Sequence, residues 1–138
     1  LRLYPPVAML ARQPAADCEI GGYPVRAGML VIVVPFITQR DTRYWPAGDR
    51  FAPDPDNPLP KRLAHKGAFA PFGGGPRICL GKHFAMVEMG IATALLCSRF
   101  DWMVESDEEP ELEFNGTIHP KVPIQAWFAT AGWHEAAT

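Results

Sequence analysis

The 138-residue sequence lacks the features that would assign it to several common classes of protein. Its longest apolar run, Met29 to Phe36, has the length of a strand and falls short of the ~18 residues that a membrane span needs. A net charge of −2 gives no reason to expect a nucleic acid or an anionic membrane as a partner. Only three cysteines and no secretory signal are present, so we expect no disulfide framework and a reducing, cytoplasmic compartment.

The sequence also lacks an initiator methionine. It opens on Leu-Arg-Leu-Tyr-Pro-Pro, which is typical of a helix end cut within the element, because Pro5 and Pro6 cannot continue a helix. We therefore expect the C-terminal part of a longer polypeptide. A membrane anchor in its missing N-terminal part is an open alternative. With 48% hydrophobic and 20% charged residues the composition is globular, and 138 residues are enough for one core.

Short strands and turns are predicted in the first part of the chain. Apolar and β-branched runs favour strands, and Gly-Gly and Ala-Gly pairs favour the turns between them. The predicted elements are a short buried strand at Val7–Arg12, a hairpin of Cys18–Ile20 and Tyr23–Val25 around Gly21-Gly22, a turn at Ala27-Gly28, a central strand at Met29–Val34, and one or two helical turns within Phe36–Tyr44.

The remainder of the chain is predicted to hold a coil, one long helix and a few strands. Proline and aspartate are dense from Trp45 to Pro60, which predicts an irregular coil, packed by Trp45 and Phe51 because aromatic rings bury large areas. Apolar residues three and four apart predict a helix from Gly81 to Arg99. Further expectations are strands at Trp102–Glu105 and Ile124–Phe128, a solvated acidic loop at Glu105–Glu113, and buried or half-buried thiols at Cys18 and Cys97.

The most informative segment surrounds Cys79. From Phe72 to Gly81 the chain runs Phe-Gly-Gly-Gly-Pro-Arg-Ile-Cys-Leu-Gly, and the predicted helix follows at once. A thiolate needs positive or dipolar neighbours, which Arg77 and the free N–H groups of the helix N-terminus provide. Glycines at 73, 75 and 81 allow tight turns and a close approach to a ligand, since they have no Cβ. The segment therefore predicts that Cys79 is a thiolate bonded to a large, flat group.

Cys79 has two simpler explanations. A free cysteine beside a glycine-rich turn is usually buried and inert. A structural metal site formed by Cys79 and His83 is excluded because no second Cys or His pair stands at the spacing that four zinc ligands need.

The spacing Phe-Gly-x-Gly-x-Arg-x-Cys-x-Gly resembles the signature of the cytochrome P450 family at every fixed position. Six specified residues coincide by chance at fewer than about one site in a million. The resemblance implies an α+β chain that forms the C-terminal portion of one mainly helical cytochrome P450 domain, residues 1–138, with small β-sheets, irregular coil, the cysteine loop and one long proximal helix. The N-terminal part of that domain, with the distal oxygen-activating helix, would be missing.

The same resemblance implies a haem site. Cys79 would be the axial ligand of the iron of haem b and the catalytic residue. The other implied cofactor-binding residues are Phe72, Gly73, Arg77, Gly81 and Arg12, the two arginines facing the haem propionates. The residues implied to border a substrate pocket are Val7, Ala8, Met9, Leu10, Gly116, Thr117 and Ile118.

Other segments also carry the resemblance, and the glutamate and second arginine of the family's structural triad are missing from this sequence. Arg2 resembles the arginine of the family's Glu-x-x-Arg pair, and Gln39-Arg40-Asp41 with Trp45 resembles its His-Arg-Asp…Trp stretch, with Gln in place of His. Thr117 to Lys121 resembles the C-terminal hairpin. Pro55 stands where the resemblance places an arginine.

The implied function is that of a haem-thiolate monooxygenase, which hydroxylates a hydrophobic small molecule with O2 and electrons from a ferredoxin or flavoprotein reductase. Lys66, Lys82 and His83 flank the cysteine loop and could receive an acidic electron-transfer partner. The alternative is an inert truncated fragment with no activity of its own.

Overall fold

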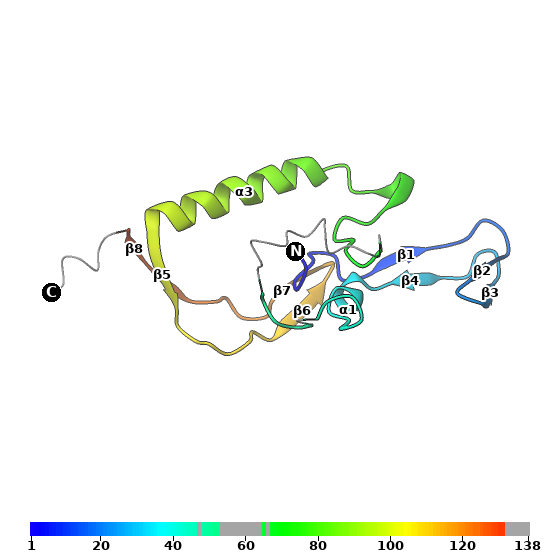
Figure 1. Ribbon diagram of the computed structural model, residues 1–138, viewed down its shortest axis with the longest axis horizontal. Helices are drawn as coiled ribbons and strands as arrows, with labels where there is room; N and C mark the ends of the chain where they lie inside the picture. Colours follow the sequence, from blue (N-terminus) through cyan, green and yellow to red (C-terminus); the bar gives the residue numbers. More distant parts are fainter. Residues whose placement is uncertain (47, 53–64, 66, 132–138) are drawn as a thin grey trace. The chain divides into compact units, whose positions relative to one another are not determined.

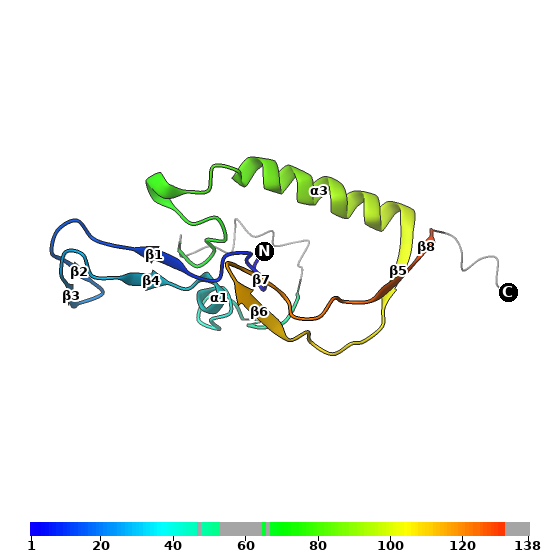
Figure 2. The same cartoon turned by 180° about the vertical axis from the view of Figure 1, so that it is seen from behind.

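The computed structural model describes residues 1–46, 48–52, 65 and 67–131. Its helices and strands follow the chain as drawn in Figure 1 and, from behind, in Figure 2. The described strands pair into four two-stranded sheets, and one long helix accompanies them, so the α+β class is confirmed. The chain divides into two compact units, Leu1–Gly73 with Phe114–Ile118 (unit 1) and Gly74–Glu113 with His119–Thr138 (unit 2).

Unit 1 begins with two antiparallel pairs. Strand β1 (Leu10–Arg12) pairs with β4 (Val31–Val33), and β2 (Cys18–Ile20) pairs with β3 (Tyr23–Val25). Gly21 and Gly22 have φ of +59° and +85°, the left-handed values that a two-residue hairpin turn of type I′ requires. The predicted hairpin is confirmed, and so is the turn at Gly28, where φ is +77°.

The predicted burial of two strands is wrong. Within the described residues β4 has β1 as its one partner, so it is not a central strand, and Ile32 is 50% exposed. In the run Val7–Arg12 only Ala8 is buried. β-Branched residues favour an extended backbone, but the neighbours that bury a strand come from elsewhere in the chain.

Helix α1 (Pro35–Thr38) confirms the predicted helical turn, with Pro35 at its start, where a missing N–H costs nothing. The coil that follows packs through Trp45, which is 5% exposed and donates from Nε1 to the Ala68 carbonyl at 3.2 Å. Phe51 is 84% exposed, so its predicted packing is wrong. The described residues of the coil form turns and bends, and residues 53–60 of this prediction lie outside the described residues.

Unit 2 contains the 3₁₀ turn η1 (Gly75–Arg77), helix α3 (Lys82–Arg99) and the antiparallel strands β5 (Phe100–Val104) and β8 (Ala126–Thr130). The helix continues directly into β5, as Figure 1 shows. The predicted helix and both predicted strands are confirmed, with small shifts of their ends. Among the described residues of α3 none is buried, and Phe84 and Val87 are 74% and 61% exposed.

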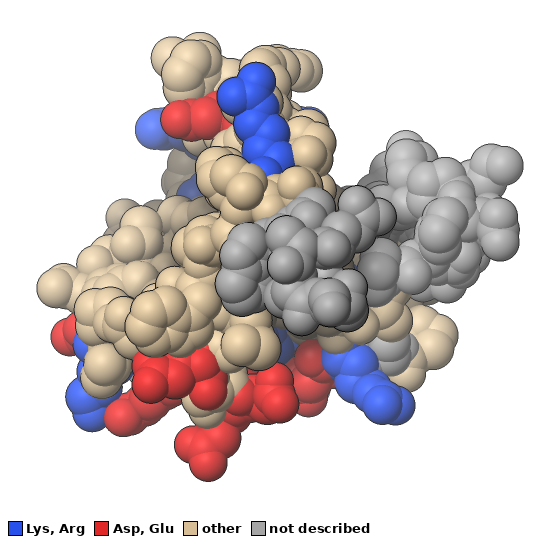
Figure 3. Space-filling model, turned by 90° about the vertical axis from the view of Figure 1, so that its left-hand side faces the viewer, with Lys and Arg blue, Asp and Glu red and all other residues tan. Residues whose placement is uncertain are grey.

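Strands β6 (Leu112–Asn115) and β7 (Thr117–Pro120) pair as a hairpin, with Gly116 at the turn at φ +75°. The predicted C-terminal hairpin is therefore present. The predicted acidic loop is wrong at its end, because Leu112 and Glu113 belong to β6. Most acidic side chains before that strand are exposed, and Figure 3 shows charged side chains standing at the surface.

Candidate functional site

The cysteine loop is built by glycines with unusual backbone angles. Gly73 and Gly75 have φ of +72° and +68°, which L-residues with a Cβ rarely adopt. The Ile78 amide donates to the Gly75 carbonyl at 3.1 Å and closes the turn η1. Positions 73 and 75 of the motif therefore require glycine for the backbone conformation itself.

The thiol of Cys79 lies exposed where α3 begins. The Lys82 amide donates to the Cys79 carbonyl at 3.3 Å, and Gly81 is the N-cap of the helix without a side-chain cap. A Cβ added at Gly81 would lie 3.9 Å from the Cys79 sulfur. The φ of Gly81 is an ordinary −81°, and a Cβ at this distance would make van der Waals contact with the sulfur, so glycine keeps this side of the thiol free of a side chain.

The two predicted propionate-binding arginines have exposed side chains. Arg77 is the last residue of η1, two residues before Cys79 in unit 2. Arg12 is the last residue of β1 in unit 1, and its Nη1 donates to the Ala11 carbonyl at 2.8 Å. Among the described residues no carboxylate pairs with either guanidinium. Both cations are therefore available to an anionic ligand.

The structure groups the predicted cofactor residues by unit. Arg77, Cys79 and Gly81 lie together in unit 2, whereas Arg12, Phe72 and Gly73 belong to unit 1. Phe72 is half-buried. Of the three residues expected to face an electron-transfer partner, Lys82 is half-buried and His83 exposed at the start of α3, and Lys66 lies outside the described residues.

Unit 1 brings the two predicted substrate-pocket segments together. The Ile118 amide donates to the Pro6 carbonyl at 2.8 Å, which places the hairpin tip, Gly116 to Ile118, beside the segment that begins at Val7. The Phe36 amide donates to the Ala8 carbonyl, and the Phe36 and Phe114 rings meet edge to face with centroids 5.6 Å apart. Val7 and Met9 present 37% and 56% of their surface. An apolar, open surface at this place suits contact with a hydrophobic molecule.

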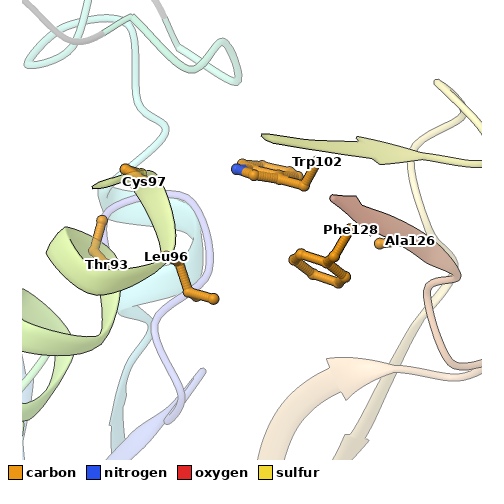
Figure 4. Close-up of a pocket in the computed structure, with 6 residues that line it drawn as sticks. All are labelled: Thr93, Leu96, Cys97, Trp102, Ala126 and Phe128. Carbon is orange, nitrogen blue, oxygen red and sulfur yellow. The ribbon is translucent and has the colours of Figure 1, made fainter. Parts of the chain in front are cut away.

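A cavity of about 300 Å³ in unit 2 contains none of the predicted site residues. It is lined by Thr93, Leu96 and Cys97 of α3 and by Trp102, Ala126 and Phe128 of the strands, and the two aromatic rings point toward the helix (Figure 4). In the sequence, the i, i+3, i+4 spacing of Thr93, Leu96 and Cys97 indicates that these residues share the helix face that lines this cavity. Cys97, like Cys18, is exposed, so the expectation of buried or half-buried thiols is wrong.

Sequence reasoning identified Arg2 but gave Gln39 no role. Arg2 donates from Nη1 to the carbonyls of Gln39, at 3.0 Å, and Gly48, and from Nη2 to that of Arg50. Its guanidinium lies 5.2 Å from the centre of the Trp45 ring. Burial, and then the neighbouring Arg40, lower the pKa of Arg2. Arg2 thus holds the described part of the coil, whereas Pro55 lies outside the described residues.

Comparison with known proteins now places the chain in a class. It matches the family model of cytochrome P450 over residues 1–128. It is 33% identical over 135 residues to cytochrome P450 4V2 of Mus musculus, covering 98% of this chain and 26% of that protein. It is 36% identical over 121 residues to the (+)-vincadifformine 19-hydroxylase of Catharanthus roseus, covering 86% and 24%.

A solved structure agrees with these relatives. The retinoic-acid-bound cyanobacterial CYP120A1 is 32% identical, with a TM-score of 0.81 over 94% of this chain and 30% of that chain. The chain belongs to the cytochrome P450 family. It spans about a quarter of the length of the curated relatives it matches. In the described part of the chain, no helix has the length and apolar character needed to cross a bilayer.

Proposed function

We propose that this chain is the C-terminal, thiolate-bearing portion of a cytochrome P450 that hydroxylates a hydrophobic small molecule with O2 and electrons from a redox partner. One observation carries the proposal. The complete signature holds Cys79 exposed at the N-terminus of α3, with the space beside its sulfur left open by Gly81.

The residues present fit haem b. The exposed thiol of Cys79 suits a metal whose other ligands come from a macrocycle, because one side chain then completes its coordination. A Cβ added at Gly74 or Gly75 would meet no heavy atom within 4 Å, which leaves an open face beside the loop. Haem bound through a thiolate supplies electron density that favours O–O cleavage.

Each proposed haem-binding residue has a distinct task. Cys79 would hold the iron, and Arg77 and Arg12 would bind the propionates through charge-assisted hydrogen bonds. Phe72 would limit the access of water to the sulfur, which is one control of a metal's redox potential. Gly73 provides the turn into the loop, and Gly81 leaves room for the ligand.

The substrate and the electron donor are proposed from the chemistry of the surface. The segments Val7–Leu10 and Gly116–Ile118 form an apolar surface in unit 1 that suits a hydrophobic substrate. The retinoic acid bound to the solved relative and the vincadifformine named for the curated hydroxylase belong to the same broad class of molecule. A ferredoxin or flavoprotein reductase would approach Lys82 and His83 and supply the electrons.

A second candidate is that residues 1–138 alone form an inert fragment. The observation that favours it is helix α3, on which no described residue is buried and whose apolar side chains face water. Such surface is costly unless something covers it. The proposed monooxygenase activity therefore applies to the full-length protein, and the isolated chain is expected to be inactive.

The test is the reduced carbon-monoxide difference spectrum of the full-length protein and its cysteine variants. The wild type and Cys97→Ala, the matched control at another exposed cysteine, should both show the thiolate-type Soret band and hydroxylate substrate. Cys79→Ala and Cys79→His should lose both properties, because an imidazole donates less electron density than a thiolate. An unchanged Soret band with wild-type turnover in Cys79→Ala would exclude Cys79 as the ligand.

A further inference from the structure

Gln39 is the one polar residue that is fully buried in the described part of the chain, at 0% exposure. Its Nε2 donates to the carbonyls of Leu1 and Arg2 at 3.0 and 2.9 Å, and its Oε1 accepts from the Ala70 amide at 3.0 Å. An amide side chain has two N–H donors and one oxygen acceptor. Both donors and the acceptor are therefore in use, toward segments on either side of the residue in sequence.

The link between Gln39 and Arg2 runs in both directions. The Gln39 side chain donates to the Arg2 carbonyl, and the Arg2 guanidinium donates to the Gln39 carbonyl at 3.0 Å. The backbone N–H of Gln39 also closes α1, because it donates to the Pro35 carbonyl at 2.9 Å. Buried polar groups that are fully satisfied resist rearrangement, since each broken bond leaves an unpaired group. Gln39 is therefore a fixed point in unit 1.

From this fixed point the hydrogen bonds continue toward the cysteine loop. Both backbone polar groups of Ala70 are hydrogen-bonded. Its N–H donates to Gln39 Oε1, and its carbonyl accepts from the Gly73 N–H at 3.0 Å. Trp45 holds the two preceding residues, with Nε1 on the Ala68 carbonyl and its ring edge to face with that of Phe69 at 6.1 Å. The segment that leads into the signature is thus bonded at consecutive residues.

We propose that Gln39 is a positioning residue for the cysteine loop. Its side-chain amide fixes the backbone of Ala70 by a hydrogen bond. The hydrogen bond from Gly73 to Ala70 then fixes the start of the loop that carries Cys79. This inference rests on the proposed function, in which Cys79 is the haem ligand. Gln39 does not touch the reacting atoms, and its role is to define where the loop starts.

An amide at this position also makes the attachment insensitive to pH. A neutral imidazole here would have one donor and one acceptor, and protonation would convert the acceptor into a second donor facing the Ala70 N–H. Among the described residues, the charged and titratable groups around Gln39 are Arg2 and Arg40, the latter with its partner Asp49 at 2.9 Å. A histidine introduced here would therefore stand among cations, and its protonated form would lack an acceptor for Ala70.

The experiment compares Gln39→Leu, Gln39→His and the control Thr38→Val in the full-length protein. Thr38 is the last residue of α1, directly before Gln39, and its hydroxyl donates to the Val34 carbonyl at 3.2 Å and not to Ala70. Two quantities are measured between about pH 6 and 8, the range in which an imidazole titrates. They are the thiolate-type fraction in the reduced carbon-monoxide spectrum and the hydrogen exchange of the Ala70 and Gly73 amides.

Gln39→Leu should speed exchange of the Ala70 and Gly73 amides about tenfold, as the loss of a buried hydrogen bond predicts, and should lower the thiolate-type fraction. Gln39→His should approach the wild type near pH 8 and resemble Gln39→Leu near pH 6. Thr38→Val should change neither quantity.

The proposal is overturned if Gln39→Leu and Thr38→Val behave alike while the wild type shows the thiolate band. If Gln39→Leu does not fold, Gln39→His decides, and a spectrum and exchange that match the wild type at every pH overturn the proposal. A wild type without the thiolate band contradicts the proposed function itself, which separates the two failures.

Discussion

Replacing Arg2 by methionine should free the coil that follows α1. The guanidinium makes three hydrogen bonds to backbone carbonyls, those of Gln39, Gly48 and Arg50, and it also lies over the Trp45 ring at 5.2 Å. Methionine keeps much of the side chain's length and apolar stem but makes none of these bonds. The effect should therefore report the hydrogen bonds and the charge.

The expected magnitude follows from those contacts. A hydrogen bond from a charged donor contributes about 1.5–3 kcal/mol, and a partly solvated cation over an aromatic ring adds about 0.5–1 kcal/mol. The bond to Arg50 is exposed and contributes least. Since the guanidinium is only partly buried, we expect local opening of the coil to become easier by about 3 kcal/mol, below the full sum. Arg2→Lys should lose about half as much, because lysine keeps the charge without the planar fork.

Hydrogen exchange at Gly48 provides the assay. The Gly48 amide donates to the Trp45 carbonyl at 2.7 Å, so its exchange reports opening of the coil. Arg2→Met in the full-length protein should speed this exchange roughly 100-fold or more, the factor that about 3 kcal/mol corresponds to. Arg43→Met is the matched control, because Arg43 is largely exposed and its guanidinium contacts Asp41 and, at 5.6 Å, the Tyr44 ring rather than the carbonyls that Arg2 binds. Equal exchange at Gly48 in the two variants would refute the assignment of Arg2 as the anchor of the coil.

Three further predictions concern haem retention, the isolated chain and acid stability. Arg12→Ala and Arg77→Ala should each speed haem loss about tenfold with the Soret position unchanged, since each removes a charge-assisted contact without touching the iron; haem content after gel filtration equal to the wild type in both would show that the propionates bind elsewhere. Residues 1–138 expressed alone should bind haem weakly, aggregate and hydroxylate nothing, because α3 exposes its apolar side chains, and a monomeric chain with stoichiometric haem and turnover would contradict this. Hydrogen bonds from Arg43 lower the pKa of Asp41, so the Asp41 carboxylate contributes to stability above its pKa in the unfolded chain, and this contribution is lost as pH falls through its lower pKa in the folded chain. Asp41→Asn should therefore make unfolding less sensitive to acid. Urea midpoints of the variant that change with pH as in the wild type would contradict this prediction.

The parts of the site that the sequence predicted depend on neighbouring residues alone. The positive φ of Gly73 and Gly75, the start of α3 after Gly81 and the hairpin around Gly21-Gly22 follow from local sterics and from the spacing of apolar side chains. The cysteine signature occupies ten consecutive residues and could therefore be recognised without any tertiary contact.

Burial and partnership were decided only by the tertiary structure. Gln39 resembles an ordinary polar residue until Leu1, Arg2 and Ala70, each more than thirty residues away, surround its amide. In the same way β4 is rich in β-branched residues but has a single described partner, and Phe51 is aromatic but exposed. The physical reason is that local sequence sets the backbone conformation, whereas burial is set by contacts with segments distant in the chain. The sequence by itself determined the family and the cysteine, and the tertiary structure decided how the chain leading to that cysteine is held.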